Sequence, residues 1–326
     1  MPHFFSRVVD SLPGFRSEDR LERELEQARE QIAHQRKQIR RLQRQPTEGP
    51  VIKPQNVVWI FGAGRSGSTW LASMMGELEG HYVWFEPQLG ELFDPERLSI
   101  GVRKGQDFVF ASRYKWVWLR SVRNFVLDGA AARFPEGAKV LVIKEPHGSA
   151  GAPLLVEALP ESRVVLLVRD PRDAVASALD AVERGIWQGD AWRGMYGGDE
   201  FDGRPDTFVE QAAHSYFRHV GNARRAYEAH RGRKVLIRYE DLREDTLGVM
   251  KRIYSTLGIP VDEEELKRAV EKHSWENIPE EEKGEGRFYR KGKPGGWKED
   301  LTEEQARTVE RITAPLLEEF YPEEQT

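Results

Sequence analysis

The stretch Val57–Thr69, VVWIFGAGRSGST, decides the fold of this chain. Its first five residues form a short apolar run, which is typical of a strand buried in a parallel sheet. A glycine-rich turn follows and leads into a helical pattern at Thr69–Leu78. Because this order of elements directs free backbone N–H groups and the positive end of a helix dipole at one place, the stretch predicts an anion-binding loop.

The loop differs from a nucleoside triphosphate loop at one position. Gly62 and Gly67 have the spacing of the GxxxxGK[ST] pattern, and Thr69 stands where its hydroxyl belongs. Ser68, however, replaces the lysine that clamps the β- and γ-phosphates. The sequence therefore disfavours a P-loop kinase, which stays as an alternative, as does a glycine turn without a ligand.

The rest of the chain after residue 57 alternates between strand and helix patterns. This alternation predicts an α/β fold of the P-loop type, with three layers, a central parallel sheet and a ligand at the carboxyl ends of the strands. Gly185–Pro205, rich in Gly, Trp and Asp, predicts a long loop. The further expected strands are Tyr82–Phe85, Val140–Ile143, Val164–Val168 and Val235–Ile237, and the further expected helices are Ala174–Val182, Phe208–Ala229, Leu247–Leu257, Glu263–Lys272 and Glu303–Phe320.

Two more basic segments accompany the loop. Arg169 comes directly after the apolar run Val164–Val168, and Ser177 follows eight residues later on the next expected helix. An arginine at a strand's carboxyl end points into the ligand crevice, and its planar fork suits phosphate. The segment Arg290–Lys298, RKGKPGGWK, is basic and rich in glycine, so it can wrap a polyanion. Taken alone, each has an ordinary alternative: an ion pair for Arg169 and a solvated turn for Arg290–Lys298.

Together the three segments resemble the sulfotransferases that use 3′-phosphoadenosine-5′-phosphosulfate (PAPS). Gly64–Trp70 is similar to the family's loop for the 5′-phosphosulfate, Arg169 and Ser177 to its 3′-phosphate pair, and Arg290–Thr302 to its RKGxxGDWKxxxT segment, with Gly296 where Asp is usual. Tyr239, in Tyr-Glu-Asp-Leu, resembles a residue beside the adenine, and Trp70 the one that stacks on it. The resemblance implies that the donor-binding residues are Arg65, Ser66, Gly67, Ser68, Thr69, Trp70, Arg169, Ser177, Tyr239, Arg290, Lys291 and Gly292.

This resemblance implies PAPS as the co-substrate and no metal, because the donor carries one 5′-phosphate bearing sulfate and a second phosphate at the 3′ position. The implied reaction is in-line transfer of the sulfuryl group to a hydroxyl or amine acceptor. The rival hypotheses are the kinase and a non-catalytic scaffold that binds adenosine bisphosphate. Aromatic residues flank the expected site and suit a carbohydrate or a small alcohol alike: Tyr114, Trp116, Trp118, Trp187, Trp192 and Tyr196. All six are expected in loops, with Trp116 and Trp118 in a strand as the alternative.

The transfer needs a base for the acceptor proton, and three residues are candidates. Glu86 follows the strand Tyr82–Phe85 and resembles the glutamate of tyrosylprotein sulfotransferases. His147 lies one residue later than the histidine of the cytosolic small-molecule enzymes, and Glu145 lies beside it. Glu86 is the preferred base, and Lys144 is expected to stabilise the transferring group.

Residues 18–45 contain no Gly, Pro or aromatic residue, and their apolar positions alternate by four and three. This heptad pattern predicts a short coiled coil that makes a homo-oligomer, with a lone solvated helix as the alternative. The expected organisation is a tail at 1–17, the helical arm at 18–45, a linker at 46–56 and a sulfotransferase domain at 57–326.

The composition excludes several classes of protein and of functional site. The 326 residues include no cysteine, which excludes disulfides, zinc–thiolate sites, iron–sulfur clusters and a catalytic thiol. The net charge of −5 argues against a nucleic-acid partner. No apolar run reaches the ~18 residues of a membrane span, and Met1–Phe15 has no signal-peptide pattern, so the expected location is the cytoplasm.

Overall fold

The structure is a computed structural model that describes residues 25–33, 52–94, 112–183, 203–284, 292 and 294–322. The chain divides into two compact units, Met1–Val51 and Ile52–Thr326. In the first unit, residues 25–33 form a helix whose residues are all exposed. The remainder of the predicted coiled-coil arm at 18–45 lies outside the described residues.

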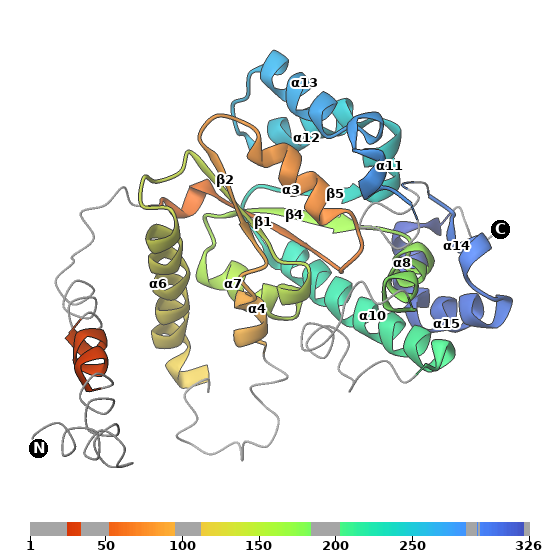
Figure 1. Ribbon diagram of the computed structural model, residues 1–326, viewed down its shortest axis with the longest axis horizontal. Coiled ribbons are helices and arrows are strands. Elements are labelled where there is room, and N and C mark those ends of the chain that lie inside the picture. Colours follow the sequence, from red (N-terminus) through yellow and green to blue (C-terminus); the bar gives the residue numbers. More distant parts are fainter. Residues whose placement is uncertain are drawn as a thin grey trace, which may run out of the picture. The chain divides into compact units, whose positions relative to one another are not determined.

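The second unit is built on a sheet of five parallel strands in the order β2-β3-β1-β4-β5. In Figure 1 the strands β1, β2, β4 and β5 are labelled among the surrounding helices. Each strand coincides with a predicted apolar run to within one residue at either end. Because β1 is central, its carboxyl end lies between the ends of β3 and β4, which is where ligands bind in open parallel sheets. The strands are β1 Val57–Gly62, β2 His81–Phe85, β3 Val140–Lys144, β4 Arg163–Val168 and β5 Lys234–Arg238.

Helices cover both faces of the sheet, which confirms the predicted three-layer α/β fold. Alternate residues of a strand point to opposite faces. In β1, Trp59 and Phe61 pack under one set of helices, while Val58 and Ile60 pack under the other. The first set is α6 (Lys115–Arg133), α7 (Ala152–Ala158), α10 (Pro205–Ala229) and α15 (Glu303–Phe320); the second is α3 (Ser68–Gly76), α11 (Tyr239–Glu244), α12 (Thr246–Leu257) and α13 (Glu263–Lys272).

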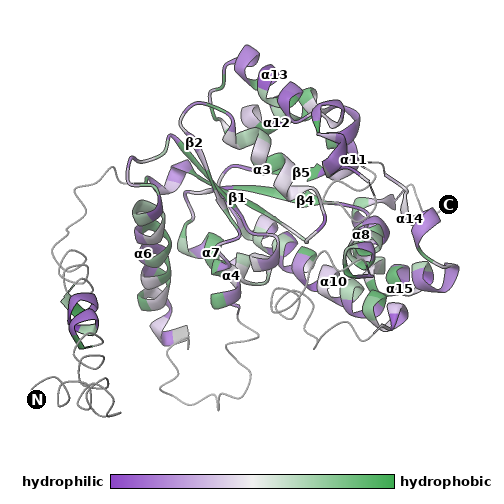
Figure 2. Ribbon diagram, viewed as in Figure 1, coloured by the Kyte–Doolittle hydropathy of each residue, from purple (hydrophilic) through white to green (hydrophobic). Residues whose placement is uncertain are grey.

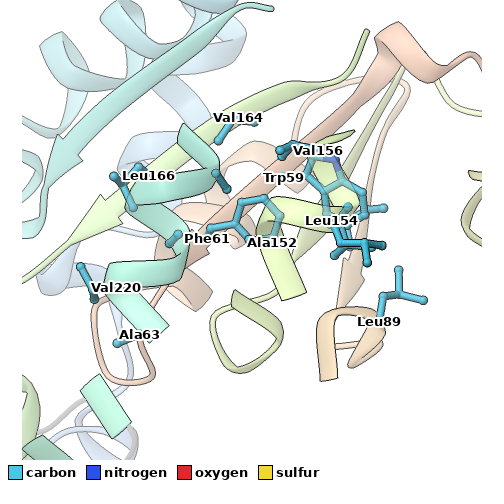
Figure 3. Packing of buried hydrophobic residues seen from close by; sticks show 14 of the residues in the cluster. Trp59, Phe61, Ala63, Leu89, Ala152, Leu154, Val156, Val164, Leu166 and Val220 are labelled. Atoms are coloured by element: carbon cyan, nitrogen blue, oxygen red, sulfur yellow. The ribbon is translucent and has the colours of Figure 1, made fainter. Parts of the chain in front are cut away.

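The buried cluster on the first face centres on two aromatic rings of β1 (Figure 3). Trp59 and Phe61 stack with ring centroids 5.5 Å apart. The indole N–H of Trp59 donates to Ser162 Oγ at 3.1 Å, so its polar atom is satisfied although the side chain is fully buried. Figure 2 shows β1 and β4 mainly in the colour of hydrophobic residues and α13 mainly in that of hydrophilic ones.

The expectation for Trp116 and Trp118 was wrong. Both residues lie in α6, neither in a loop nor in a strand. The first half of this helix, KWVWLRSV, is rich in aromatic and β-branched residues, which favour strands in isolation. Packing of Val122, Val126 and Ala130 against the sheet stabilises the helix instead.

The helix α8 Pro171–Glu183 packs against α10 and α15 in a third buried cluster. The remaining helices are short: η1 Pro54–Asn56, α4 Leu89–Leu92, η2 Ser112–Tyr114, η3 His147–Gly151, η4 Trp275–Asn277, η5 Glu280–Glu282 and α14 Trp297–Asp300. Among the described residues, no helix combines the length and the apolar character needed to cross a membrane. Trp187, Trp192 and Tyr196 lie outside the described residues, as does most of the predicted loop Gly185–Pro205.

Candidate active site

The loop between β1 and α3 has the backbone of an anion-binding turn. Arg65 and Gly67 both adopt the left-handed conformation, with φ of 64° and 84°. A side chain at Gly67 would place its Cβ 2.5 Å from the Tyr239 ring, so this position requires glycine. Ser66 is fully buried, and its hydroxyl has no hydrogen-bond partner among the described residues. A buried hydroxyl left in this state at the start of a helix indicates a polar ligand.

The structure brings the two predicted phosphate-binding segments together. Arg65 Nε donates to Ser177 Oγ at 3.0 Å. Arg169 Nη1 donates to the backbone oxygen of Arg65 at 2.9 Å. Arg169 is 9% exposed, and its Nε has no partner among the described residues. A buried guanidinium with an unused donor, beside a second arginine, forms a site for an anion.

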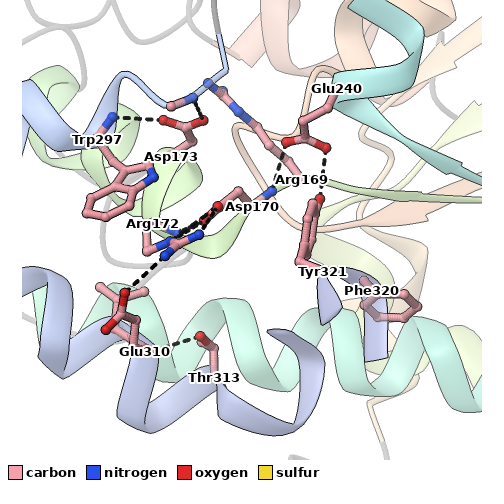
Figure 4. A network of polar contacts seen from close by, with 12 residues as sticks. Arg169, Asp170, Arg172, Asp173, Glu240, Trp297, Glu310, Thr313, Phe320 and Tyr321 are labelled. Atoms are coloured by element: carbon pink, nitrogen blue, oxygen red, sulfur yellow. Dashed lines mark hydrogen bonds and ion pairs between the residues drawn. The ribbon is translucent and has the colours of Figure 1, made fainter. Parts of the chain in front are cut away.

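A single peptide group fixes the direction of Arg169. Its carbonyl accepts a hydrogen bond from the Tyr216 hydroxyl on α10. The N–H of the same peptide, which belongs to Asp170, donates to Glu240 Oε1 on α11 at 3.1 Å (Figure 4). The Tyr321 hydroxyl donates to the other oxygen of Glu240 at 2.9 Å. Helices on both faces of the sheet therefore hold the turn that carries Arg169.

The same turn anchors the C-terminal glycine-rich segment. Both oxygens of Asp173 accept backbone hydrogen bonds, from Gly295 N at 2.7 Å and Trp297 N at 2.9 Å (Figure 4). The guanidinium of Arg172 lies 4.3 Å from the centre of the Trp297 ring. The carboxylate of Asp170 in turn holds Arg172. The first part of the segment, residues 285–291, includes the predicted donor residues Arg290 and Lys291 and lies outside the described residues.

We expect Asp173→Asn to lower the free energy of unfolding by about 1–3 kcal/mol, because an amide has one oxygen and leaves one of the two partly buried backbone N–H groups without its partner. Urea denaturation measures the change. Glu183→Gln, an exposed substitution on the same helix, is the matched control and should stay within about 0.5 kcal/mol of wild type. Equal stabilities for both variants would contradict the anchoring role of Asp173.

One lysine links the predicted base Glu86 to the phosphate loop. Lys144, at the end of β3, is almost fully buried and forms an ion pair with Glu86. The same ammonium donates to Thr69 Oγ1 at 3.2 Å. Glu86 is left-handed, with φ of 43°, although it is not glycine. Such backbone strain concentrates at functional sites. The carboxylate side chain is 34% exposed, so a substrate can reach it.

His147 also lies against the loop, because a Cβ on Gly64 would come within 2.6 Å of its ring. Burial lowers the pKa of His147; the Glu86 charge opposes this shift, and the charges of Lys144 and Arg65 add to it. The ring makes an edge contact with His219, with centroids 6.2 Å apart. Both rings line a cavity of about 20 Å³, the size of one water. His147 is therefore neutral and enclosed at pH 7.

Glu145 is enclosed more completely, at 1% exposure. Its Oε1 accepts from the backbone N–H of Leu89 at 3.1 Å. Burial raises the pKa of Glu145 from its ordinary value of 4.5 to about 7, against the opposing effect of backbone N–H groups at residues 88–90. The hydrogen bond to Leu89 joins the end of β3 to α4. Because the carboxylate is buried, an acceptor cannot reach it.

The raised pKa of Glu145 predicts a pH-dependent stability. The folded protein holds this proton more tightly than the unfolded chain, so the contribution of Glu145 is most favourable below about pH 4.5 and is lost as the pH rises through about 7. Between pH 5 and pH 8, we expect Glu145→Gln to gain up to about 3 kcal/mol of unfolding free energy relative to wild type. Urea titrations of both proteins measure it. The exposed Glu318→Gln is measured as the matched control. A difference between Glu145→Gln and wild type that does not change with pH would contradict this account.

Beside the phosphate loop, Trp70 and Tyr239 meet edge to face with ring centroids 6.4 Å apart, as expected for neighbours in one site. The indole N–H of Trp70 donates to the backbone oxygen of His273 at 2.7 Å. Gly292 lies next to Trp275, which sequence reasoning did not single out. Trp275 occupies an ordinary polar turn after a helix, and only the packing of distant segments shows its place.

Within the described ranges, no group of three or more His, Asp or Glu side chains is arranged to hold a metal ion. The sequence profile of the sulfotransferase domain family matches residues 55–321. The chain therefore belongs to the sulfotransferase domain family, as the motifs predicted. It is 26% identical over 186 residues to sulfotransferase 2A1 of Rattus norvegicus; the match covers 50% of this chain and 59% of that relative.

Solved structures share the fold. Mouse sulfotransferase SULT7A1, complexed with PAP, superposes with a TM-score of 0.52 at 15% identity, covering 82% of this chain and 86% of that one. Retinol dehydratase in a complex with retinol and PAP superposes with a TM-score of 0.51 at 21% identity, covering 82% of each chain. At these identities the likeness establishes the α/β fold and leaves the chemistry to the site itself.

Proposed function

We propose that this protein transfers the sulfuryl group of PAPS to a hydroxyl or amine acceptor. The observation that carries the proposal is the junction of Arg65, Arg169 and Ser177, with two buried donors, Ser66 Oγ and Arg169 Nε, unsatisfied within the described residues. These groups fit a donor with two separate phosphates. The PAP in the solved complexes of two proteins of this fold, adenosine 3′,5′-bisphosphate, supports the same ligand class.

In the proposed site, the loop amides, Ser66, Ser68 and Thr69 hold the 5′-phosphosulfate. Arg169 and Ser177 hold the 3′-phosphate. Ser68 stands where the GxxxxGK[ST] pattern has its lysine, and this is consistent with the proposed donor, because PAPS has no β- and γ-phosphates to clamp. Such preorganised donors stabilise charge that develops during transfer without further rearrangement.

The proposed base is Glu86, which accepts the proton of the attacking acceptor. Of the three candidates, its carboxylate is the most exposed, while Glu145 is bound to backbone and His147 is enclosed. Lys144 lies between Glu86 and Thr69, so its ammonium is placed to neutralise charge on the transferring group. Positioning and charge neutralisation then supply most of the rate enhancement.

A groove of about 670 Å³ runs beside β2 and includes Phe85, the residue before Glu86. Tyr82, Phe85 and Phe134 give it an aromatic lining. This volume suits a small-molecule ligand. The lining also includes Glu77, His81, Arg133, Glu136 and His273, so the groove does not favour an alcohol, a phenol or a sugar over the others.

Transfer of labelled sulfate from PAPS tests the function. The panel contains phenols, apolar alcohols, amines and sugars, and release of PAP is measured in parallel. We expect labelled product with at least one hydroxyl or amine acceptor of the panel, without added metal. Binding of ATP·Mg²⁺ together with failure to bind PAP would overturn the proposal and favour the kinase, whereas PAP binding with no transfer to any acceptor would favour the scaffold.

A further inference from the structure

Two arginines and three aromatic rings form one line of contacts that starts at the phosphate site. Arg169 lies over the Tyr239 ring at 4.5 Å, and Tyr239 meets Trp70 edge to face. The guanidinium of Arg243 then lies 5.4 Å from the centre of the Trp70 ring and 5.7 Å from that of Trp275. We call these five residues the cation–ring ladder.

Arg243 is the central cation of the ladder and also its link to the C-terminal segment. Its Nε donates to the backbone oxygen of Gly292 at 2.7 Å. Gly292 is left-handed, with φ of 59°, and a Cβ there would lie 2.5 Å from the Trp275 ring. The backbone at Gly292 is therefore in direct contact with the indole that Arg243 faces. Within the part of the chain that the structure describes, the two Nη groups of Arg243 donate to no other atom.

We propose that Arg243 is a positioning residue of the donor site, which holds Trp70, Trp275 and the Gly292 backbone together as the wall that receives the donor's base. This inference rests on the proposed function. A guanidinium is planar and weakly hydrated, so it can face two indoles while its Nε donates sideways; an ammonium cannot do both. The positive charge also raises the local concentration of a donor with two phosphates.

The alternative is that Arg243 only stabilises the fold. A structural role would change the stability of the free protein and leave the balance between KM and kcat untouched. A positioning role at the donor site changes KM for PAPS and the affinity for PAP, and leaves kcat at saturating PAPS near the wild-type value, because Arg243 has no contact with Glu86 or Lys144.

The test compares Arg243→Lys, which keeps the charge, with Arg243→Gln, which removes it. Arg252→Lys and Arg252→Gln, at an exposed position on α12, are matched controls. Calorimetry with PAP measures affinity, thermal denaturation measures the stability of the free protein, and steady-state kinetics with an active acceptor separates KM from kcat.

We expect Arg243→Lys to weaken PAP binding about tenfold, since it loses the two ring contacts and a charged hydrogen bond, and Arg243→Gln to weaken it by about 30-fold or more. The KM for PAPS should rise in parallel, with kcat within about twofold of wild type. The free Arg243 variants should also melt below wild type, because these contacts are present without the donor, so KM and PAP affinity are the readouts that separate the two roles. Both Arg252 variants should melt and bind PAP like wild type.

Wild-type affinity in both Arg243 variants would overturn the inference. Wild-type affinity in Arg243→Lys alone would also overturn it, because charge without planar geometry would then suffice. A fall in kcat at unchanged KM would assign Arg243 to a different step. If Arg243→Gln does not fold, Arg243→Lys carries the test. Failure of the wild-type protein to bind PAP is a separate result, which would remove the proposed function itself.

Discussion

Replacing Glu86 by Gln should lower the rate of sulfuryl transfer by about 10²–10⁴-fold, the contribution typical of a general base. The amide can still accept a hydrogen bond from Lys144 and has nearly the shape of the carboxylate. The substitution therefore leaves the Lys144–Thr69 contact in place. PAP affinity should stay within about threefold of wild type, because no donor-binding side chain is removed. Initial rates at saturating PAPS and calorimetry with PAP measure the two quantities.

Two further variants separate Glu86 from its rivals. Glu318→Gln, an exposed change on α15, is the matched control and should turn over like wild type. His147→Ala removes the second candidate base, and we expect a smaller loss of rate from it, since His147 is enclosed behind Gly64. If His147→Ala abolishes transfer and Glu86→Gln does not, Glu86 is not the base.

Replacing Arg169 by Ala should weaken PAP binding by at least about 30-fold, the lower end of the loss when one partner of a buried charged contact is truncated. Arg169 is buried, its Nη1 holds the loop at Arg65 O, and its guanidinium lies over Tyr239. The substitution removes both the charge for the 3′-phosphate and the support of the loop. Calorimetry measures the affinity.

Arg231→Ala, at an exposed turn after α10, removes the same charge away from the site and should bind PAP like wild type. Arg169→Lys should recover part of the lost affinity, because an ammonium keeps the charge without the bidentate fork. Unchanged PAP affinity in Arg169→Ala would mean that the donor's second phosphate binds elsewhere.

The five strands were predictable because each is a short apolar run bounded by Gly, Pro or charged residues, and the central strands β1, β3 and β4 are buried almost throughout. The phosphate loop was predictable from the local order of strand, glycine-rich turn and helix. The places of Arg169 at a strand's carboxyl end and of Ser177 on the helix after it could be expected from the sequence, as could those of Lys144 and Glu86 at the ends of β3 and β2. These signals are contained in single short segments.

Contacts between distant segments were not predictable. Asp173 and Trp297 are 124 residues apart, and Tyr216 reaches Arg169 from a helix on one face of the sheet. Arg243 and Trp275 carry no local pattern that separates them from ordinary surface residues. Helix α6 was missed because its aromatic and β-branched residues favour a strand, and packing against the sheet overrides this preference. Such residues become visible only once the sheet places their segments side by side.

The most direct measurement of the central claim is a calorimetric comparison of PAP with adenosine 5′-monophosphate, which lacks the 3′-phosphate. If the protein has separate sites for the 5′-phosphate and the 3′-phosphate of the donor, wild-type protein binds PAP at least about tenfold more tightly than the monophosphate, without metal. In Arg169→Ala this preference should disappear. Equal affinity of the wild-type protein for the two nucleotides, or tighter binding of ATP·Mg²⁺ than of PAP, would contradict the account.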